Sequence, residues 1–206
     1  MKPRVIFSAL ILFSLSVTAA QAATISAEEV VRNAIDQVTT TLVAEKAMLQ
    51  QHPDRVFDVI EDIVVPHFDF PIMSRLVLGK TTWRDATDLQ KDEFTREFTM
   101  LLVKTYGKAL QQYTDETISV LSTNTNPSSN LVEVKTEITG TGSGAATPIS
   151  YRMHISGEEW KVLDLVVDGI SLVNSYRGEY SSIVRKDGLD GLISRMKQKN
   201  STVSSE

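Results

Sequence analysis

Cysteine is absent from all 206 residues of the chain. Its absence excludes disulfide bonds, thiol catalysis, iron–sulfur clusters and cysteine-based zinc sites, so an apolar core has to stabilise the fold. After residue 22 the chain also lacks any apolar run that approaches the ~20 residues of a membrane-spanning helix. We therefore expect the chain beyond residue 22 to fold as a water-soluble protein.

Recognisable catalytic and metal-binding motifs are missing as well. The chain has no G-x-S-x-G nucleophile elbow, and its glycine-rich run at residues 140–144 lies between two expected strands without a following helix. The three histidines, His52, His67 and His154, are not spaced as paired metal ligands, so we expect each to be structural or solvated. These absences predict no metal, no cofactor and no catalytic residue.

The N-terminus has the three parts of a secretory signal peptide. Lys2 and Arg4 supply the positive start, residues 5–17 form the apolar middle, and Ala20-Gln21-Ala22 has the small residues that a signal peptidase reads. The apolar run is short for a membrane anchor, and no cysteine follows it to carry a lipid. The pattern predicts cleavage after Ala22 and export from the cytoplasm.

The rest of the chain has the length of one domain. Removing residues 1–22 from the 206 residues leaves 184, and because it removes two bases and no acid the formal charge changes from −5 to −7. An acidic protein is a poor partner for nucleic acid, and simple electrostatic adsorption to anionic lipid is also disfavoured. We expect one domain over residues 23–199 and a disordered polar tail over residues 200–206.

Helical periodicity dominates the first half of this domain. Two capping boxes mark helix starts, S-A-E-E at residues 26–29 and T-D-L-Q at residues 87–90. Apolar residues then recur every three or four positions, and the longest helix carries a wide apolar stripe that has to cover a large surface. The expected helices are residues 26–52, 54–64, 72–78 and 87–113.

The period changes from 3.6 to 2 in the second half. Clean alternation of apolar and polar residues predicts an antiparallel meander of about four strands with one wet face. Helices before and after the sheet indicate an α+β fold, in which N- and C-terminal helices wrap a twisted sheet. Such a sheet forms a cone that can hold an apolar cavity. The expected strands are residues 117–123, 132–138, 149–155 and 160–167, followed by helices at 171–186 and 189–197.

Asp164 is the one carboxylate inside an apolar strand. An aspartate in the cavity of a cone fold acts as general base in steroid isomerases. One interpretation is therefore a cone-fold enzyme on a small apolar substrate, with Asp164 as base and Tyr151 as partner. The alternative is an aspartate that is bonded to an arginine or that faces water. Asp69 and Asp168, beside turns, are expected to cap backbone amides.

A series of short motifs covers most of the domain. They are V-P-H-F-D-F at residues 65–70, L-V-L-G at 76–79 with Trp83, Y-G-K-A-L at 106–110, W-K-V-L-D at 160–164, V-D-G-I-S-L at 167–172 and G-L-D-G-L at 188–192. Together they resemble the MlaC family of periplasmic phospholipid-binding proteins, also called toluene-tolerance proteins. The spacing from Gly79 to Trp83 is one residue longer than the family pattern.

This resemblance implies a lipid carrier rather than an enzyme. Proteins of this family have a cone fold similar to nuclear transport factor, with an apolar pocket for the acyl chains of a phospholipid. They shuttle phospholipid across the periplasm of Gram-negative bacteria and help to maintain outer-membrane lipid asymmetry. Their partners are an inner-membrane ABC transporter, through its MCE-domain subunit, and an outer-membrane lipoprotein bound to porins. The implied carrier is monomeric, with phospholipid as cargo and no cofactor.

The pocket of such a fold is expected to have three sides. Because periodicity alone does not separate an open pocket from a packed core, a structural interaction domain without a ligand is a third interpretation. The cationic cluster Arg185, Lys186, Arg195, Lys197 and Lys199 is either a docking surface or a solvated face. The expected lipid-binding residues are Phe98, Leu101, Leu102 and Tyr106 from the long helix, Val134, Tyr151, Met153 and Leu165 from the sheet, and Ile170, Leu172 and Val173 near the mouth.

Overall fold

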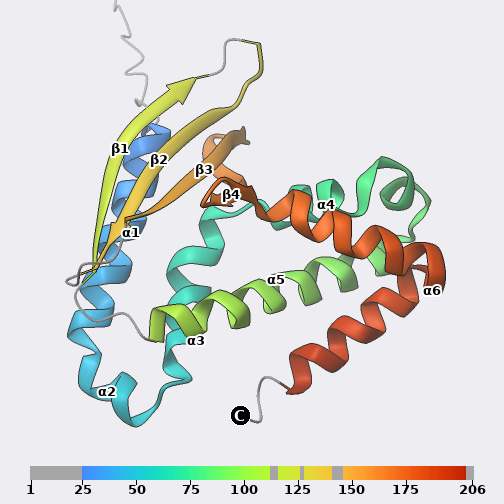
Figure 1. The fold of residues 1–206 in the computed structure, drawn as a ribbon, viewed down its shortest axis with the longest axis horizontal. Helices are drawn as coiled ribbons and strands as arrows, with labels where there is room; N and C mark the ends of the chain where they lie inside the picture. The colour runs from blue at the N-terminus through green and yellow to red at the C-terminus, as the bar shows by residue number, and fades with distance from the viewer. Residues whose placement is uncertain (1–24, 112–115, 126–127, 141–145, 203–206) are drawn as a thin grey trace, which may run out of the picture.

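The computed structural model of the chain describes residues 25–111, 116–125, 128–140 and 146–202. A curved antiparallel sheet lies on one side of the molecule and a group of helices on the other, with α1 along one face of the sheet (Figure 1). This arrangement confirms the α+β class that the order of helices and strands predicts. The expected signal peptide, residues 1–22, lies outside the described residues.

Helical elements fill the chain before the sheet. A π-helical turn, η1, and a 3₁₀ turn, η2, follow α3 without a break, and a kink at Gly79 with a φ of 77° divides α4. Over the described residues, no helix combines the length and apolarity that crossing a bilayer requires. These elements are α1 (Ala27–Ala44), α2 (Lys46–Gln51), α3 (Arg55–Val59), η1 (Ile60–Val64), η2 (Val65–His67), α4 (Phe70–Asp85) and α5 (Asp88–Gln111).

Both predicted capping boxes form. The Ser26 hydroxyl accepts a hydrogen bond from the amide of Glu29, and the Thr87 hydroxyl accepts one from the amide of Gln90. Several helix boundaries differ from expectation, and α4 continues past the kink at Gly79 to Asp85 instead of ending at residue 78. The first helix breaks at Glu45 instead of reaching residue 52, and α4 starts two residues early because Asp69 caps it through the Ile72 amide.

The sheet follows the chain order β1-β2-β3-β4-β5, and each strand is antiparallel to the next. Strand β5 has only two residues, which are too few to show alternation in the sequence. The sequence therefore predicts about four strands and misses this fifth one. Shifts in register leave Leu121 unpaired in β1 and Leu163 unpaired in β4, as β-bulges. The strands are β1 (Thr117–Thr125), β2 (Val132–Thr139), β3 (Thr147–Ser156), β4 (Glu159–Val167) and β5 (Ile170–Ser171).

Helix α6 (Leu172–Thr202) ends the described chain. A kink at Gly188, where φ is 71°, separates its two arms, as the sequence predicts for two C-terminal helices. The second arm reaches Thr202, and Asn200 is only 3% exposed. This helix corrects the prediction of a disordered tail for residues 200–202, while residues 203–206 lie outside the described part.

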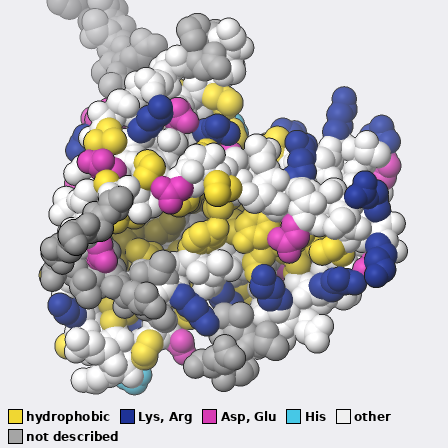
Figure 2. Space-filling model, in the orientation of Figure 1, with side chains coloured by type: hydrophobic (Ala, Val, Ile, Leu, Met, Phe, Trp, Pro, Cys, Tyr) yellow, Lys and Arg dark blue, Asp and Glu magenta, His cyan; other side chains and the backbone are white. Residues whose placement is uncertain are grey.

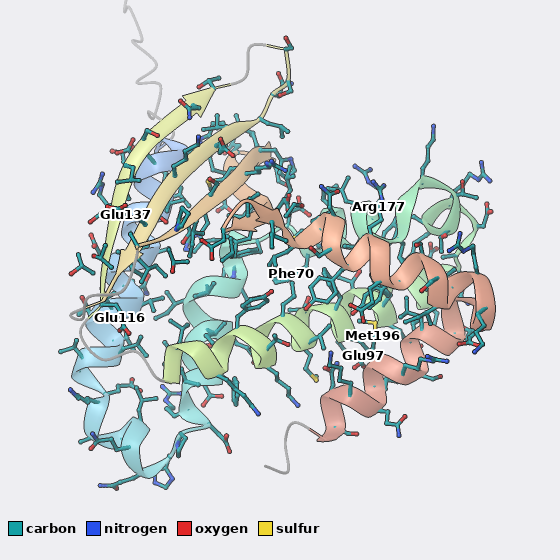
Figure 3. The ribbon with its side chains drawn as sticks, in the orientation of Figure 1. Phe70, Glu97, Glu116, Glu137, Arg177 and Met196 are labelled. Atoms are coloured by element: carbon teal, nitrogen blue, oxygen red, sulfur yellow. The ribbon has the colours of Figure 1, made fainter. Side chains whose placement is uncertain are left out.

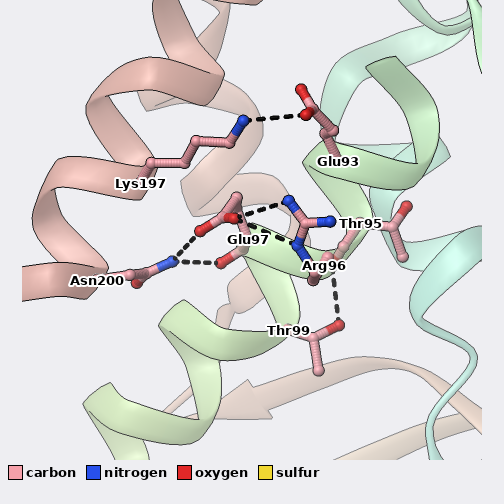
Figure 4. Close-up of polar contacts among 7 residues, drawn as sticks. All are labelled: Glu93, Thr95, Arg96, Glu97, Thr99, Lys197 and Asn200. Atoms are coloured by element: carbon pink, nitrogen blue, oxygen red, sulfur yellow. Dashed lines mark hydrogen bonds and ion pairs between the residues drawn. The ribbon is translucent and has the colours of Figure 1, made fainter. Parts of the chain in front are cut away.

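Asn200 fastens the end of α6 to α5 (Figure 4). Its side-chain amide donates to the backbone carbonyl of Glu97 at 3.0 Å and to the Glu97 carboxylate at 2.9 Å. Arg96 pairs with the same carboxylate at 3.3 Å, and Lys197 pairs with Glu93 one turn away at 3.0 Å. Because the Glu97 side chain is buried, the donors of Asn200 and Arg96 replace the hydration that its carboxylate loses.

Large aromatic side chains fill the space between α4, α5 and α6, which we call the aromatic core. Phe94 and Phe98 are fully buried, stack with ring centroids 5.7 Å apart, and meet the ring of Tyr180 edge-on. Phe70 from α4 and Met196 from the second arm of α6 complete the cluster (Figure 3). The second arm therefore packs on the same core as the first.

Replacing Asn200 with alanine is expected to destabilise the fold by about 1–3 kcal/mol, because the buried Glu97 carboxylate loses a donor. Urea unfolding followed by circular dichroism measures the change. Asn174→Ala, at an exposed position of the same helix, is the control and should cost less than ~0.5 kcal/mol. Equal unfolding midpoints for the two variants would contradict the anchoring role of Asn200.

Two helical glycines are expected to respond to alanine in opposite ways. A Cβ at Gly107 would lie 2.8 Å from the Phe57 ring and 2.9 Å from Ile60, so Gly107→Ala should destabilise by ~1–3 kcal/mol. Nothing in the described structure lies within 4 Å of a Cβ at Gly178, so Gly178→Ala should stabilise by ~0.5–1 kcal/mol. Thermal unfolding measures both, and a gain in both variants would show that α5 does not approach α3 this closely.

Candidate functional site

An apolar cavity of about 230 Å³ lies between α1 and the sheet, and we call it the α1 cavity. Side chains of α1 form one wall and side chains of β1 to β4 the other, while η1, η2 and the end of α5 contribute the rest. Apolar side chains gather in a hollow between the sheet and α5 (Figure 2). The lining residues are Val30, Val31, Ala34, Ile35, Val38, Val64, His67, Phe68, Leu110, Ile118, Ile138, Ile149, Tyr151, Met153, Val162 and Leu165.

Small and β-branched side chains make up the α1 wall. Val31, Ile35 and Val38 belong to the apolar stripe that predicts the helix, and Ala34 between them contributes only a methyl group. Toward the start of the helix, Val30 and Val31 pack against buried residues of β2, β3 and β4. Short side chains at these positions border a space without filling it, in contrast to the phenylalanines of α5.

A β-bulge sets the sheet wall. Tyr151 and Met153 are two residues apart on β3 and face the α1 cavity, as alternation requires. Their partners on β4 are Leu165 and Val162, which are three residues apart because Leu163 is unpaired. The bulge therefore turns both β4 residues to the face of the cavity.

Two lining residues carry polar groups, His67 and Tyr151. Burial raises the pKa of the Tyr151 phenol, whose hydroxyl shares a hydrogen bond with Thr136. Burial, together with the ammonium group of Lys161, lowers the pKa of the half-buried His67. Both shifts favour the uncharged form, and the other lining residues are hydrophobic, so the wall suits an apolar ligand.

Residues 66–69 seal the edge of β4 beside the cavity. The amide of Asp69 donates to the carbonyl of Val162 at 2.8 Å, and Phe68 pairs with Val162 in a parallel bridge. The Asp69 carboxylate lies 2.9 Å from Nε2 of His154. Because β5 pairs only with the far end of β4, this half would otherwise be a free edge. His154 and Asp69 thus have the structural roles expected of them.

Asp164 is buried and joins three elements. Its Oδ2 accepts hydrogen bonds from Arg152 at 3.1 Å and from the Ser171 hydroxyl at 2.7 Å, and its Oδ1 accepts one from the amide of Val173 at 3.1 Å. The bond to Arg152 confirms the structural alternative for this residue. Asp164 is not among the described lining residues of the α1 cavity, so this geometry argues against a general base acting with Tyr151.

The structure brings together only part of the predicted lipid-binding set. Tyr151, Met153 and Leu165 line the α1 cavity. None of the four residues of the predicted α5 wall lines this cavity; among the described residues of α5 only Leu110 does. Of the remaining predicted residues, Phe98, Leu101, Leu102 and Val173 lie in the aromatic core, Val134 and Leu172 are buried outside the lining, and Tyr106 and Ile170 are 39% and 62% exposed.

The wall formed by α1 is missing from the prediction. Its stripe is present in the sequence as V-V-x-x-A-I-x-x-V at residues 30–38, where the periodicity predicts a helix but not a cavity wall. The difference from α5 lies in side-chain size, because the α5 stripe begins with Phe94 and Phe98, which fill their own space. A stripe of small apolar residues is therefore the signal that could have located the cavity.

Protonation of His67 is expected to destabilise the fold. The pKa of His67 lies below its usual 6.5 in the folded protein, so the unfolded chain binds the proton more readily and stability should fall as the pH drops through about 6.5. His67→Gln should flatten that part of the profile, measured by thermal unfolding between about pH 5 and 8. The exposed His52→Gln is the control for loss of a histidine, and an unchanged slope in His67→Gln would contradict this role.

Comparison with known sequences relates the chain to phospholipid-transport proteins. The profile of the MlaC protein family matches residues 32–198. The toluene tolerance protein ttg2D of Pseudomonas putida is 27% identical over 162 residues, which are 79% of this chain and 74% of that protein. The intermembrane phospholipid transport system binding protein MlaC of Haemophilus influenzae is 24% identical over 170 residues, which are 81% of this chain and 78% of that protein.

A solved structure has the same fold. It is the phospholipid-binding protein from Ralstonia solanacearum in complex with a phospholipid, which is similar to this chain with a TM-score of 0.78 and 24% sequence identity. The match covers 87% of this chain and 99% of that one. Because the family profile spans most of the described residues, the chain belongs to the MlaC family.

Proposed function

We propose that the protein carries phospholipid, with the acyl chains in the α1 cavity and the headgroup at its opening. The observation that supports this proposal is the wall itself. Among its described lining residues, the only titratable side chains are a histidine and a tyrosine, whose shifted pKa values favour their uncharged forms. Acyl chains are chemically alike, so an apolar wall binds them without the convergent polar groups that a catalytic site needs.

The energetics favour a carrier over free diffusion of lipid. Exposing an acyl chain to water costs about 0.8 kcal/mol per CH₂ group. A two-chain phospholipid therefore costs on the order of 20 kcal/mol to hold in water. Burial against side chains such as Ile35, Ile149 and Met153 removes most of this cost, and the carrier itself needs no nucleotide.

The walls of the α1 cavity have to separate when lipid enters. Its volume of about 230 Å³ is below the ~300–1,000 Å³ of typical ligand pockets. The α1 wall meets the sheet through short apolar side chains, whereas β2, β3 and β4 are joined by backbone pairing along most of their length. We expect α1 to move away from the sheet, because this apolar contact is easier to open than the strand ladders.

The proposed route is between the two membranes of a Gram-negative cell. The signal peptide predicted at residues 1–22 supports export to the periplasm, and the Haemophilus relative is named as a binding protein of an intermembrane phospholipid transport system. We propose that the protein, as a monomer, exchanges phospholipid with an inner-membrane ABC transporter through an MCE-domain subunit and with an outer-membrane lipoprotein–porin complex. By this transfer it helps to maintain outer-membrane asymmetry.

Native mass spectrometry of the mature protein tests the proposal. The protein is purified from a Gram-negative host without detergent, and its bound molecules are extracted into organic solvent. Phospholipid at about one molecule per chain supports the carrier. A protein that is free of lipid and stays so after incubation with phospholipid vesicles would refute it.

Filling the cavity is expected to displace the lipid. Ala34→Phe places a ring against the space that the methyl group of Ala34 borders, so lipid recovered per protein should fall at least several-fold while the fold is retained. The control is Ala44→Phe, which adds the same ring at an exposed position of the same helix. Lipid phosphorus per protein is the readout, and equal lipid content in the two variants would show that α1 is not a wall of the lipid site.

A further inference from the structure

A second, polar cleft separates α4 from the first arm of α6. It has a volume of about 160 Å³ and shares no described lining residue with the α1 cavity. Val77, Leu78 and Val184 form its apolar sides, and Thr82, Tyr180, Ser181 and Arg185 supply the polar groups. We call it the α4–α6 cleft. Nothing in the carriage of acyl chains requires polar groups at this place.

Tyr180 is a buried residue that lines this cleft. The residue is 4% exposed, and its ring packs edge-on against Phe94 and Phe98 in the aromatic core. Among the described residues its hydroxyl has no hydrogen-bond partner. Burial also raises the pKa of the Tyr180 phenol strongly, which keeps its proton in place as a donor.

Two arginines without described acidic partners lie on this part of α6: Arg185 lines the cleft, and Arg177, outside its described lining, lies about two turns earlier in the helix. Arg177, Ser181 and Arg185 are spaced four residues apart, so they share one face of α6. The Arg177 guanidinium lies 3.7 Å from the place that a Cβ would take at Gly79, next to the kink of α4 (Figure 3). The acid nearest in sequence, Glu179, forms no described ion pair with either arginine.

Three other cations of α4 and α6 are paired. Arg84 bonds to Asp85, Lys197 bonds to Glu93, and Arg195 bonds to Asp187. In the part of the chain that the structure describes, no ion pair is formed by Arg177, by Arg185 or by Lys80, which follows the kink, nor by Arg75 or Lys186. Arg185 therefore brings unneutralised positive charge to the cleft that the Tyr180 side chain also lines.

We propose that the α4–α6 cleft binds a phosphate-class oxyanion, held by the Arg185 and Arg177 guanidinium groups and by the hydroxyl of Tyr180. Guanidinium groups and hydroxyl donors match the oxygens of a phosphate group in charge and geometry. The Thr82 hydroxyl, which is free of described hydrogen bonds, is a further donor. Two sources have this chemistry, a small phosphate in solution and the phosphate of an anionic phospholipid at a membrane surface.

The test is a titration of the ¹⁵N-labelled mature protein with inorganic phosphate, followed by amide chemical shifts at constant ionic strength. Saturable shifts are expected at Val77, Leu78, Thr82 and Tyr180 to Arg185. Arg185→Gln should weaken binding roughly tenfold, since it removes a charge-assisted hydrogen bond. Lys186→Gln removes the same charge from the next residue, outside the described cleft lining, and should change affinity less than about twofold.

Tyr180→Phe separates donor chemistry from folding. It keeps the ring in the aromatic core and removes only the hydroxyl, so binding should weaken by a few-fold with an unchanged melting temperature. Shifts that never saturate, or equal losses in Arg185→Gln and Lys186→Gln, would overturn the proposal because they indicate general attraction between charges. Undiminished binding by Tyr180→Phe would remove the tyrosine from the site.

Vesicles distinguish the two sources. Sedimentation with phosphatidylcholine vesicles that contain phosphatidic acid, but not with pure phosphatidylcholine vesicles, assigns the site to lipid phosphate at a surface. Phosphate binding without sedimentation assigns it to small phosphates in solution. Because the cleft and the α1 cavity share no lining residue, lipid recovered from Arg185→Gln should match the unsubstituted protein. The two proposals therefore fail independently.

Discussion

Asp164 is the residue at which the sheet and the C-terminal helix become one structure. It is buried, and its carboxylate accepts hydrogen bonds from Arg152 on β3, Ser171 on β5 and the first turn of α6. A buried carboxylate is stable only where several donors replace its hydration, so these elements are fixed relative to one another. The direction in which α6 leaves the sheet then decides where Tyr180 meets α5 and α4. The aromatic core and the α4–α6 cleft both depend on this one side chain.

Side-chain size divides the rest of the interior into a packed part and an open part. On α5 and α6, rings such as Phe94, Phe98 and Tyr180 interlock at centroid distances of 5.7 to 6.4 Å. On α1, valine, alanine and isoleucine face the sheet across the cavity. Proteins tolerate few voids in a tightly packed interior, so an apolar cavity persists where short side chains on one wall meet a stiff wall opposite. The bulge at Leu163 supplies that second wall by turning Val162 and Leu165 to the same face.

Local signals in the sequence predict much of the fold and little of the site. The capping boxes at Ser26 and Thr87, the glycine boundary at Gly188 and the strand alternation act within a few residues, so a single sequence reveals them. The bulge at Leu163 and the sealing of β4 by residues 66–69 depend on register and on distant segments. The α1 cavity depends on which apolar stripe meets the sheet, and periodicity alone favours the larger stripe of α5. The tail prediction failed at Asn200 because its partner, Glu97, is far away in the chain.

Net charge is also a poor guide to what this protein attracts. From Ala27 to His67 the chain has eight acidic residues and three basic ones, whereas α4 has three bases and one acid and α6 has six bases and three acids. Salt screens exposed charges beyond roughly 8–10 Å, so a ligand at α4 and α6 responds mainly to their local excess of positive charge. The overall charge of −5 therefore excludes neither an anion site on these helices nor an uncharged cavity elsewhere. Because charges separated by more than a screening length act independently, one small domain combines an apolar cavity at α1 with a cationic cleft at α6.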